Sequence, residues 1–125
     1  MIKLKFWDSV NNGFCDDSDI FISSDGCAYR DLDDEMLLEP FIIPVQYTGV
    51  ESRGVELYLG DVVQSSFGIP PIPVKTVIEF DDGAFIVKTP RLFPTWCVLS
   101  EFISCFSEVE VIGNIYENPD LVGDL

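Results

Sequence analysis

The chain has 125 residues, of which 22 are acidic and 7 are basic, and its formal net charge is -15. This length corresponds to one domain, and a hydrophobic content of 47%, including ten Phe, supplies a core without metals or disulfides. So strong a negative charge would repel a nucleic-acid backbone and an anionic membrane, so neither is expected as a direct partner.

The N-terminal part combines strand patterns with an acidic run. Residues 2–7 alternate with the period of two that is typical of a strand, and a short apolar stretch at residues 19–23 predicts a second strand. Residues 16–39 contain nine carboxylates and one basic residue, Arg30. Since a packed interior would not accept this charge, the segment is expected on the surface.

The middle of the chain shows strand patterns broken by proline and glycine. Residues 41–47 read as a strand despite Pro44, whose missing N–H places that position at an edge or a bulge. Two further strands are predicted at residues 55–59 and 61–64, and Gly60 predicts a sharp bend between them.

A proline-rich loop followed by a hairpin is predicted next. Residues 65–73 contain three prolines and a glycine, and this segment is expected to be a loop because proline cannot donate the hydrogen bonds of a central strand. Strand-like residues 74–80 and 84–88 flank Asp82-Gly83, which is the composition of a hairpin closed by a type I′ turn.

The C-terminal part predicts one helix and one strand. In residues 95–106, apolar side chains recur at spacings of three and four, which predicts a helix with Thr95 as its N-cap. Residues 108–116 return to strand alternation, and Asn118-Pro119 ends this last strand. The patterns together predict a mainly β chain with one short helix and no linker that would divide it.

Four blocks of sequence, spread in order over nearly the whole chain, carry a family resemblance. They are Ile2-Lys3 with Lys5-Phe6-Trp7-Asp8, then Gln46-Tyr47-Thr48-Gly49 with Glu56-Leu57-Tyr58-Leu59-Gly60-Asp61-Val62-Val63, then Val77-Ile78-Glu79-Phe80-Asp81-Asp82-Gly83-Ala84-Phe85, and last Glu110-Val111-Ile112-Gly113-Asn114-Ile115-Tyr116-Glu117-Asn118-Pro119. With these blocks the chain resembles the YopX protein family, small proteins encoded by temperate phages and prophages of Gram-positive bacteria.

The resemblance implies a fold, an origin and a tendency to assemble, but no activity. The implied fold is a single, mainly β domain over residues 1–125. It has a small SH3-like β-barrel core at residues 40–125 and an acidic N-terminal strand and loop region at residues 1–39. The resemblance also implies a phage origin and the formation of homo-oligomers. It brings no catalytic or ligand-binding residues that could be transferred to this chain.

The motif positions of the resemblance are therefore read as structural. They are Tyr47, Gly49, Tyr58, Gly60, Asp61, Gly83 and Gly113. The glycines are expected at turns, bends or close backbone approaches, and the Asp61 carboxylate is expected to accept local backbone N–H groups.

No arrangement of residues predicts catalysis or a bound cofactor. The chain contains no histidine, which removes the commonest general base and the commonest neutral metal ligand. The pair Asp16-Asp17 and the run Asp33-Asp34-Glu35 lie in an exposed acidic segment, where nothing would raise one carboxyl pKa selectively. Residues 31–35 also lack the ligand order and central glycine of an EF-hand loop. We therefore predict no enzyme activity, no cofactor and no metal site.

The cysteines and tryptophans are expected to have structural roles. The chain contains four cysteines, namely Cys15, Cys27, Cys97 and Cys105. Their spacing matches neither a redox motif nor a zinc site, so they are predicted to be buried, reduced thiols. Trp7 and Trp96 are expected to anchor the core or an oligomer interface.

The leading functional hypothesis is a non-catalytic phage accessory protein that binds a basic surface on a host or phage protein. A compact body of this charge would imitate the field of a phosphate backbone, which suits an anti-restriction or anti-CRISPR role. The start of the chain lacks the pattern of a secretory signal, so the host cytoplasm is the expected location. The carboxylates expected to bind the partner are Asp16, Asp17, Asp19, Asp25, Asp31, Asp33, Asp34 and Glu35.

Two alternatives stay open beside this hypothesis. The first is a homo-oligomeric structural or assembly module, in which the acidic run provides only solubility. The second is an indirect regulator of phage gene expression that acts through another protein.

Overall fold

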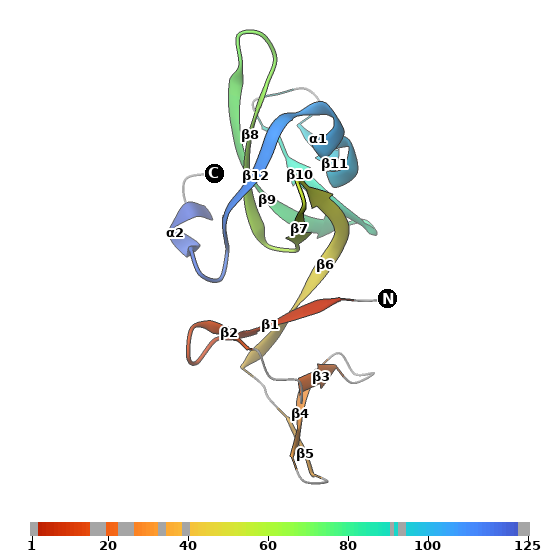
Figure 1. The fold of residues 1–125 in the computed structure, drawn as a ribbon, viewed down its shortest axis with the longest axis vertical. Helices are drawn as coiled ribbons and strands as arrows, with labels where there is room; N and C mark the ends of the chain where they lie inside the picture. Colours follow the sequence, from red (N-terminus) through yellow and green to blue (C-terminus); the bar gives the residue numbers. More distant parts are fainter. Residues whose placement is uncertain are drawn as a thin grey trace. The chain divides into compact units, whose positions relative to one another are not determined.

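A computed structural model of the chain describes residues 3–15, 20–22, 27–32, 35–38, 41–90, 92 and 95–122. These residues form curved antiparallel sheets with barrel-like curvature and a short helix, which confirms the predicted mainly β fold (Figure 1). The chain divides into two compact units, an N-terminal unit at Met1–Gln46 and a C-terminal unit at Tyr47–Leu125.

Strands make up most of both units. The N-terminal unit contains β1 (Leu4–Asp8), β2 (Gly13–Cys15), β3 (Ile20–Ile22), β4 (Ala28–Leu32), β5 (Glu35–Leu38) and the start of β6 (Ile42–Ser52). The C-terminal unit contains the rest of β6, β7 (Val55–Tyr58), β8 (Asp61–Phe67), β9 (Ile72–Asp81), β10 (Ala84–Lys88), β11 (Trp96–Val98), α1 (Leu99–Cys105), β12 (Ser107–Asn114) and α2 (Pro119–Val122).

In the N-terminal unit, β1 pairs antiparallel with β2 on one side and with the start of β6 on the other. Pro44 of β6 lies opposite Phe6 of β1, whereas the pairing of β6 with β7 begins only at Tyr47. In the described pairing, Pro44 therefore lies where β6 has a single partner strand. This agrees with the edge position that a residue without an N–H requires.

The acidic run contains a small three-stranded sheet, in the order β3-β4-β5. The sequence predicted only β3 of these strands, because β4 and β5 have no clear alternation of apolar and polar residues. Ile20 and Ala28 are buried together with Ile42 of β6, and Phe6 packs against this cluster. The acidic run is therefore not only a surface segment, because part of its backbone forms a sheet and its apolar side chains help to form a core.

The turn between β1 and β2 is organised by the Asp8 side chain. Its Oδ1 accepts hydrogen bonds from the backbone N–H groups of Val10 at 2.9 Å and Asn11 at 3.1 Å, and its Oδ2 accepts one from Asn11 Nδ2 at 2.8 Å. Asn12 follows with a φ of 55°, a value that asparagine tolerates better than most residues. The Asp8 carboxylate thus closes the first hairpin.

We expect the Asp8 carboxyl to titrate below 3.8, because hydrogen bonds from Asn11 lower its pKa, with smaller contributions from Val10 and the Arg30 charge. A lowered pKa means that this carboxylate stabilises the hairpin above the ordinary aspartate pKa, and that the stabilisation is lost as the pH falls through the lowered value. Carbon-detected NMR titration of Asp8 would measure the midpoint. In Asn11→Ala the midpoint should rise, because one donor is lost. A midpoint at or above 3.8 in the unmodified chain would contradict the expectation.

The C-terminal unit is built on a five-stranded antiparallel sheet in the order β11-β10-β9-β8-β12. Its core consists of the buried residues Leu57, Val63, Val74, Ile78, Val87, Leu99, Phe102 and Val109. The Ser52 hydroxyl of β6 donates a 2.7 Å hydrogen bond to the Val109 carbonyl of β12, which links these two strands. Helix α1 contributes Leu99 and Phe102 to the core.

The predicted loop at residues 65–73 is wrong, because most of it is strand. β8 continues to Phe67 and β9 begins at Ile72, so that only residues 68–71 form the turn of a long hairpin (Figure 1). Pro73 is tolerated opposite Ser66, because β10 pairs with β9 only from Ile78 onward and β9 has one described partner at Pro73. The tip of the hairpin is apolar and exposed, with Ile69 fully accessible to solvent.

The predicted hairpin at Asp82-Gly83 is confirmed. In the pairing of β9 with β10, Ile78 lies opposite Val87 and Asp81 lies opposite Ala84. Both turn residues have positive φ, 51° at Asp82 and 81° at Gly83. A type I′ turn requires positive φ at its two central residues.

The predicted helix is shorter than expected, and Thr95 does not cap it. Residues 96–98 form β11, with Trp96 paired to Lys88 of β10, and α1 begins only at Leu99. Val98 occupies the N-cap position without a side-chain hydrogen bond. The spacing of three between Trp96 and Leu99 imitated a helical period, although the chain changes from strand to helix between them.

Candidate interaction site

The acidic residues proposed to bind a partner fall mostly outside the described part of the chain. Those outside it are Asp16, Asp17, Asp19, Asp25, Asp33 and Asp34. The backbone of Asp31 lies in β4 and that of Glu35 in β5, where Asp31 pairs with Met36 and Leu32 pairs with Glu35. The role of these carboxylates stays a prediction.

The motif tyrosines and Asp61 lie around the bend between β7 and β8. Tyr47 and Tyr58 are opposite each other in β6 and β7, with ring centroids 5.4 Å apart. The Asp61 Oδ2 accepts a hydrogen bond of 2.8 Å from the Tyr58 backbone N–H, and Asp61 is only 8% exposed. Gly49 has a φ of 81° where the register of β6 shifts between Tyr47 and Glu51. These contacts hold β6, β7 and the start of β8 together, which agrees with the structural role expected of the motif residues.

Gly60 and Gly113 allow the turn after β12 to approach the sheet closely. Gly60 has a φ of 90°, its N–H donates to the Ile78 carbonyl at 3.0 Å, and its carbonyl accepts from the Ile115 N–H at 2.9 Å. At Gly113, a Cβ would lie 2.5 Å from Asn118 Oδ1 and 2.8 Å from Leu121 Cδ1. A side chain at this position would therefore force the Asn118 and Leu121 side chains to move.

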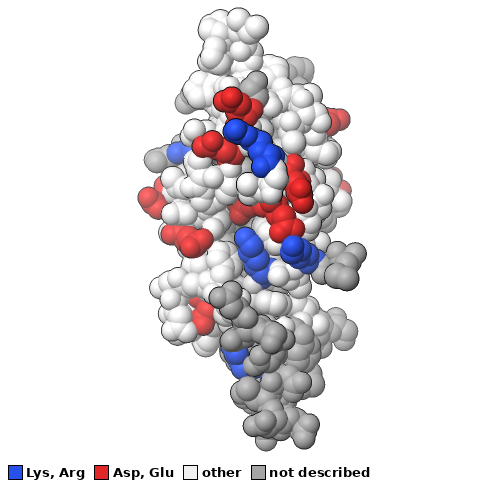
Figure 2. Space-filling view, viewed as in Figure 1, with Lys and Arg blue, Asp and Glu red and all other residues white. Residues whose placement is uncertain are grey.

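Negative charge is distributed over both units. Residues 1–46 contain ten acidic and three basic side chains. Residues 47–125 contain twelve acidic and four basic side chains. On the face drawn in Figure 2, acidic side chains are spread over the surface of the described residues, with basic side chains among them. This face therefore offers separate acidic positions rather than one continuous acidic patch.

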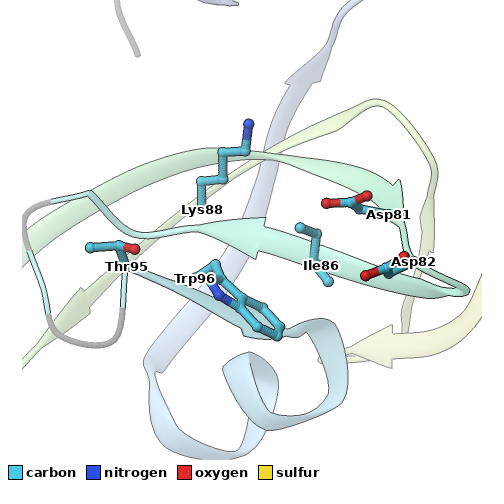
Figure 3. A pocket seen from close by; sticks show the side chains of 6 residues that line it. All are labelled: Asp81, Asp82, Ile86, Lys88, Thr95 and Trp96. Carbon is cyan, nitrogen blue, oxygen red and sulfur yellow. The ribbon is translucent and has the colours of Figure 1, made fainter.

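A hollow of about 340 Å³ lies on the outer face of the sheet where β9, β10 and β11 meet (Figure 3). It is lined by Asp81, Asp82, Ile86, Lys88, Thr95 and Trp96. The register explains why residues from distant parts of the chain meet here: β10 pairs with β9 through Ala84 and Asp81, and with β11 through Lys88 and Trp96. The two aspartates lie at the turn end of the hollow and Thr95 at the other end, with Trp96 between them.

Trp96 is the most unusual residue of the hollow, because 53% of it is exposed. Ile86 beside it is buried, so the hollow has an apolar floor below the indole. An exposed indole next to an apolar floor and two carboxylates suits a cationic side chain, whose stem would pack on the apolar surface while its charge faces the aromatic ring and the carboxylates.

Lys88 does not cancel the negative charge at the turn end of this hollow. Its Nζ lies 3.7 Å from Glu79 Oε2, and the Lys88 side chain points away from the indole in Figure 3. Both side chains of this ion pair are substantially exposed, so the pair itself is weak. Asp81 and Asp82 are exposed as well and remain available to a basic partner.

The sequence did not point to this hollow. Trp96 was expected as a core or oligomer-interface anchor, and Asp82 only as a turn residue. A half-exposed tryptophan is not visible in a periodic pattern, because the pattern reports spacing and not exposure. By contrast, Trp7 is buried and packs edge-on against Phe14 at a centroid distance of 5.0 Å.

The prediction of buried cysteines is wrong, because none of the four is fully buried. Cys27 and Cys105 are exposed, and Cys15 and Cys97 are only partly buried. Burial raises the pKa of Cys97, and the nearby Glu101 and Cys105 raise it further. A raised pKa keeps this thiol protonated, which makes it a poor nucleophile.

Metal-binding clusters and membrane-spanning helices are absent from the described residues. No group of three or more cysteine, aspartate or glutamate side chains within them is placed to hold a metal ion. Among the described helices, none has the length and apolar character needed to cross a membrane.

Comparison with known proteins connects the chain to one family. The family model described as YopX protein matches residues 5–123. Among solved structures, the crystal structure of the protein yopX from Bacillus subtilis matches with a TM-score of 0.65 and 20% sequence identity, covering 95% of this chain and 96% of that one. No curated protein matched the chain. At this level of identity the structural match shows a shared fold.

Proposed function

Because the chain belongs to the YopX protein family, we propose that it is a non-catalytic phage accessory protein that acts by binding a protein partner with a basic surface. The observation that supports this most directly is the hollow at Trp96, where a half-exposed indole lies beside Asp81 and Asp82. Tryptophan is enriched at the energetic centres of protein interfaces. The adjacent carboxylates would select a lysine or arginine of the partner.

The net charge of -15 supports the same proposal at longer range. A basic partner would be drawn to this field before contact, which raises the association rate at low salt. The acidic segment at residues 16–39 would add to the attraction. A protein that normally grips nucleic acid has a suitable basic surface, so restriction and CRISPR proteins of the host are the partners that this proposal favours.

Affinity capture from a lysate of the bacterial host tests this function. We expect the tagged chain to capture a protein with a basic surface at low ionic strength, and to lose it at high ionic strength. The reason is that the screening length falls from about 10 Å at 0.1 M salt to about 3 Å at 1 M salt. Capture that is equally strong at both salt concentrations, or capture only of partners without a basic surface, would contradict the proposal.

A homo-oligomeric assembly module is the second candidate, and the tip of the β8–β9 hairpin favours it. Phe67, Ile69 and Ile72 are all exposed there, and residues 65–74 contain no charged side chain. Apolar surface of this kind is typical of contacts between protein chains. Light scattering of the purified chain would measure the assembly, and Ile69→Asp should dissociate an oligomer that uses the tip.

A further inference from the structure

A second concave surface of the C-terminal unit has a different chemistry from the Trp96 hollow. It is a groove of about 760 Å³ on the outer face of β9. Lys75, Val77 and Glu79 alternate along β9 and therefore point to this same face. Lys88 joins them from β10, where the preceding residue, Val87, pairs with Ile78. The groove is larger than the hollow and lies within the size range of small-molecule sites.

The far wall of the groove is apolar and held in place by the backbone. Ile115 and Tyr116 form it, packed directly against Gly60, where a Cβ would lie 3.2 Å from Ile115 Cγ1 and from Tyr116 Cε2. Asn114 fixes the turn, because its Oδ1 accepts the backbone N–H groups of Tyr116 at 3.0 Å and Glu117 at 2.8 Å. A ligand would therefore meet a preformed wall.

The charge of this groove is opposite to that of the molecule. Three basic side chains of the C-terminal unit lie in the described residues, Arg53, Lys75 and Lys88, and two of them line the groove. The one acidic side chain in its lining is Glu79, whose exposed ion pair with Lys88 is weak and can be exchanged for a ligand. Lys75 and Lys88 stand on neighbouring strands, within reach of a single anionic group.

Tyr116 does not add a negative charge to this site. Its side chain is partly buried, and burial raises the pKa of the phenol above its ordinary value. The phenol therefore stays neutral at physiological pH and contributes an aromatic surface. With Val77, Pro90 and Ile115 it makes most of the lining apolar.

We propose that this groove binds a small amphipathic anion, with an apolar body and one carboxylate, sulfonate or phosphate group. The apolar body lies against Val77, Pro90 and Ile115, and the anionic group lies between Lys75 and Lys88. The groove shares Lys88 and Thr95 with the Trp96 hollow, but it selects a ligand of the opposite charge to the basic partner. The negative field of the whole chain weakens the attraction, so an apolar body is required in addition to the charge.

Fluorescence of anilinonaphthalene sulfonate, an aromatic sulfonate that brightens in apolar surroundings, tests this site on the full chain. We expect one molecule to bind per chain and decanoate to displace it. Decanol, which has the same apolar body without the charge, should displace it at least tenfold less effectively. Inorganic phosphate alone should not displace it, because it has no apolar body.

Variants locate the bound probe. The double variant Lys75→Gln/Lys88→Gln changes two partly or fully exposed side chains and should fold, and we expect its affinity for the probe to fall at least tenfold. Val77→Trp fills the groove and should abolish binding, with folding checked by circular dichroism. Arg53→Gln, outside the groove, should bind the probe like the unmodified chain. Equal displacement by decanol and decanoate, or unchanged affinity in the double lysine variant, would overturn the proposal.

Discussion

Replacing Phe102 with alanine is expected to lower the free energy of unfolding of the C-terminal unit by about 3–5 kcal/mol. Phe102 has no exposed surface, and it lies at the centre of the core between α1 and the sheet. Its ring also lies 4.4 Å from that of Phe106, so the variant loses an aromatic contact as well as apolar burial. A loss of this size is a large part of the stability of an ordinary domain.

Urea unfolding followed by circular dichroism would measure this loss, and hydrogen exchange would locate it. Phe80→Ala is the matched control, because Phe80 is more than half exposed and contacts only one aromatic ring, that of Phe85, among the described ring pairs. We expect the control to lose less than about 1.5 kcal/mol. If Phe102→Ala were no more destabilising than Phe80→Ala, the described core of the C-terminal unit would be wrong.

Replacing Trp96 with alanine is expected to weaken binding of the captured basic partner by about 30-fold, which corresponds to a loss of about 2 kcal/mol at an interface centre. Trp96 offers a half-exposed indole, and its removal should leave the fold intact because the buried residues of the core are Leu99, Phe102 and their neighbours. Phe41→Ala is the control, since Phe41 is 60% exposed and is not one of the residues that line the hollow. Titration of the purified partner would compare the two variants.

The double variant Asp81→Asn/Asp82→Asn separates the charge of the hollow from its aromatic surface. We expect it to slow association and to reduce the dependence of binding on salt, because it removes two carboxylates that line the hollow. Trp96→Ala should instead increase the dissociation rate. If neither variant changed binding while neutralising substitutions in residues 16–39 abolished it, the partner would bind the acidic segment and not the hollow.

The parts of the fold that were predictable from the sequence are those fixed by local backbone chemistry. Asp82-Gly83 predicted its hairpin because few residue pairs adopt two consecutive positive φ values. Gly60 predicted a bend for the same reason, since its φ of 90° is rarely available to other residues. Neither conclusion needs knowledge of distant segments.

The sequence predictions were wrong or incomplete where pairing between strands overrides the local preference of the residues for a loop. The prolines at residues 70, 71 and 73 argued against strands, yet two of them lie in the turn and the third lies where β9 has a single described partner. β4 and β5 have weak strand propensity and are held by their pairing with each other and with β3. Local composition does not report such pairing.

The candidate site was less predictable than the fold. Asp81 and Trp96 are separated by a proline-containing connection and come together only through the register of β9, β10 and β11. The sequence predicted a binding surface in residues 16–39, because acidic residues are concentrated there. The hollow has only two acidic residues, and its aromatic surface depends on an exposure that no pattern of spacing reveals.

The long hairpin of β8 and β9 has a consequence for association. Its tip is held by paired strands up to Phe67 and Ile72 and by two prolines in the turn, so its backbone is already ordered in the free chain. Flexible interface segments give up about 0.5–1.5 kcal/mol of conformational entropy for each long side chain that becomes immobilised, in addition to the ordering of the loop. A stiff, apolar tip avoids the cost of ordering the loop, so more of the free energy of a contact made there is kept as binding free energy.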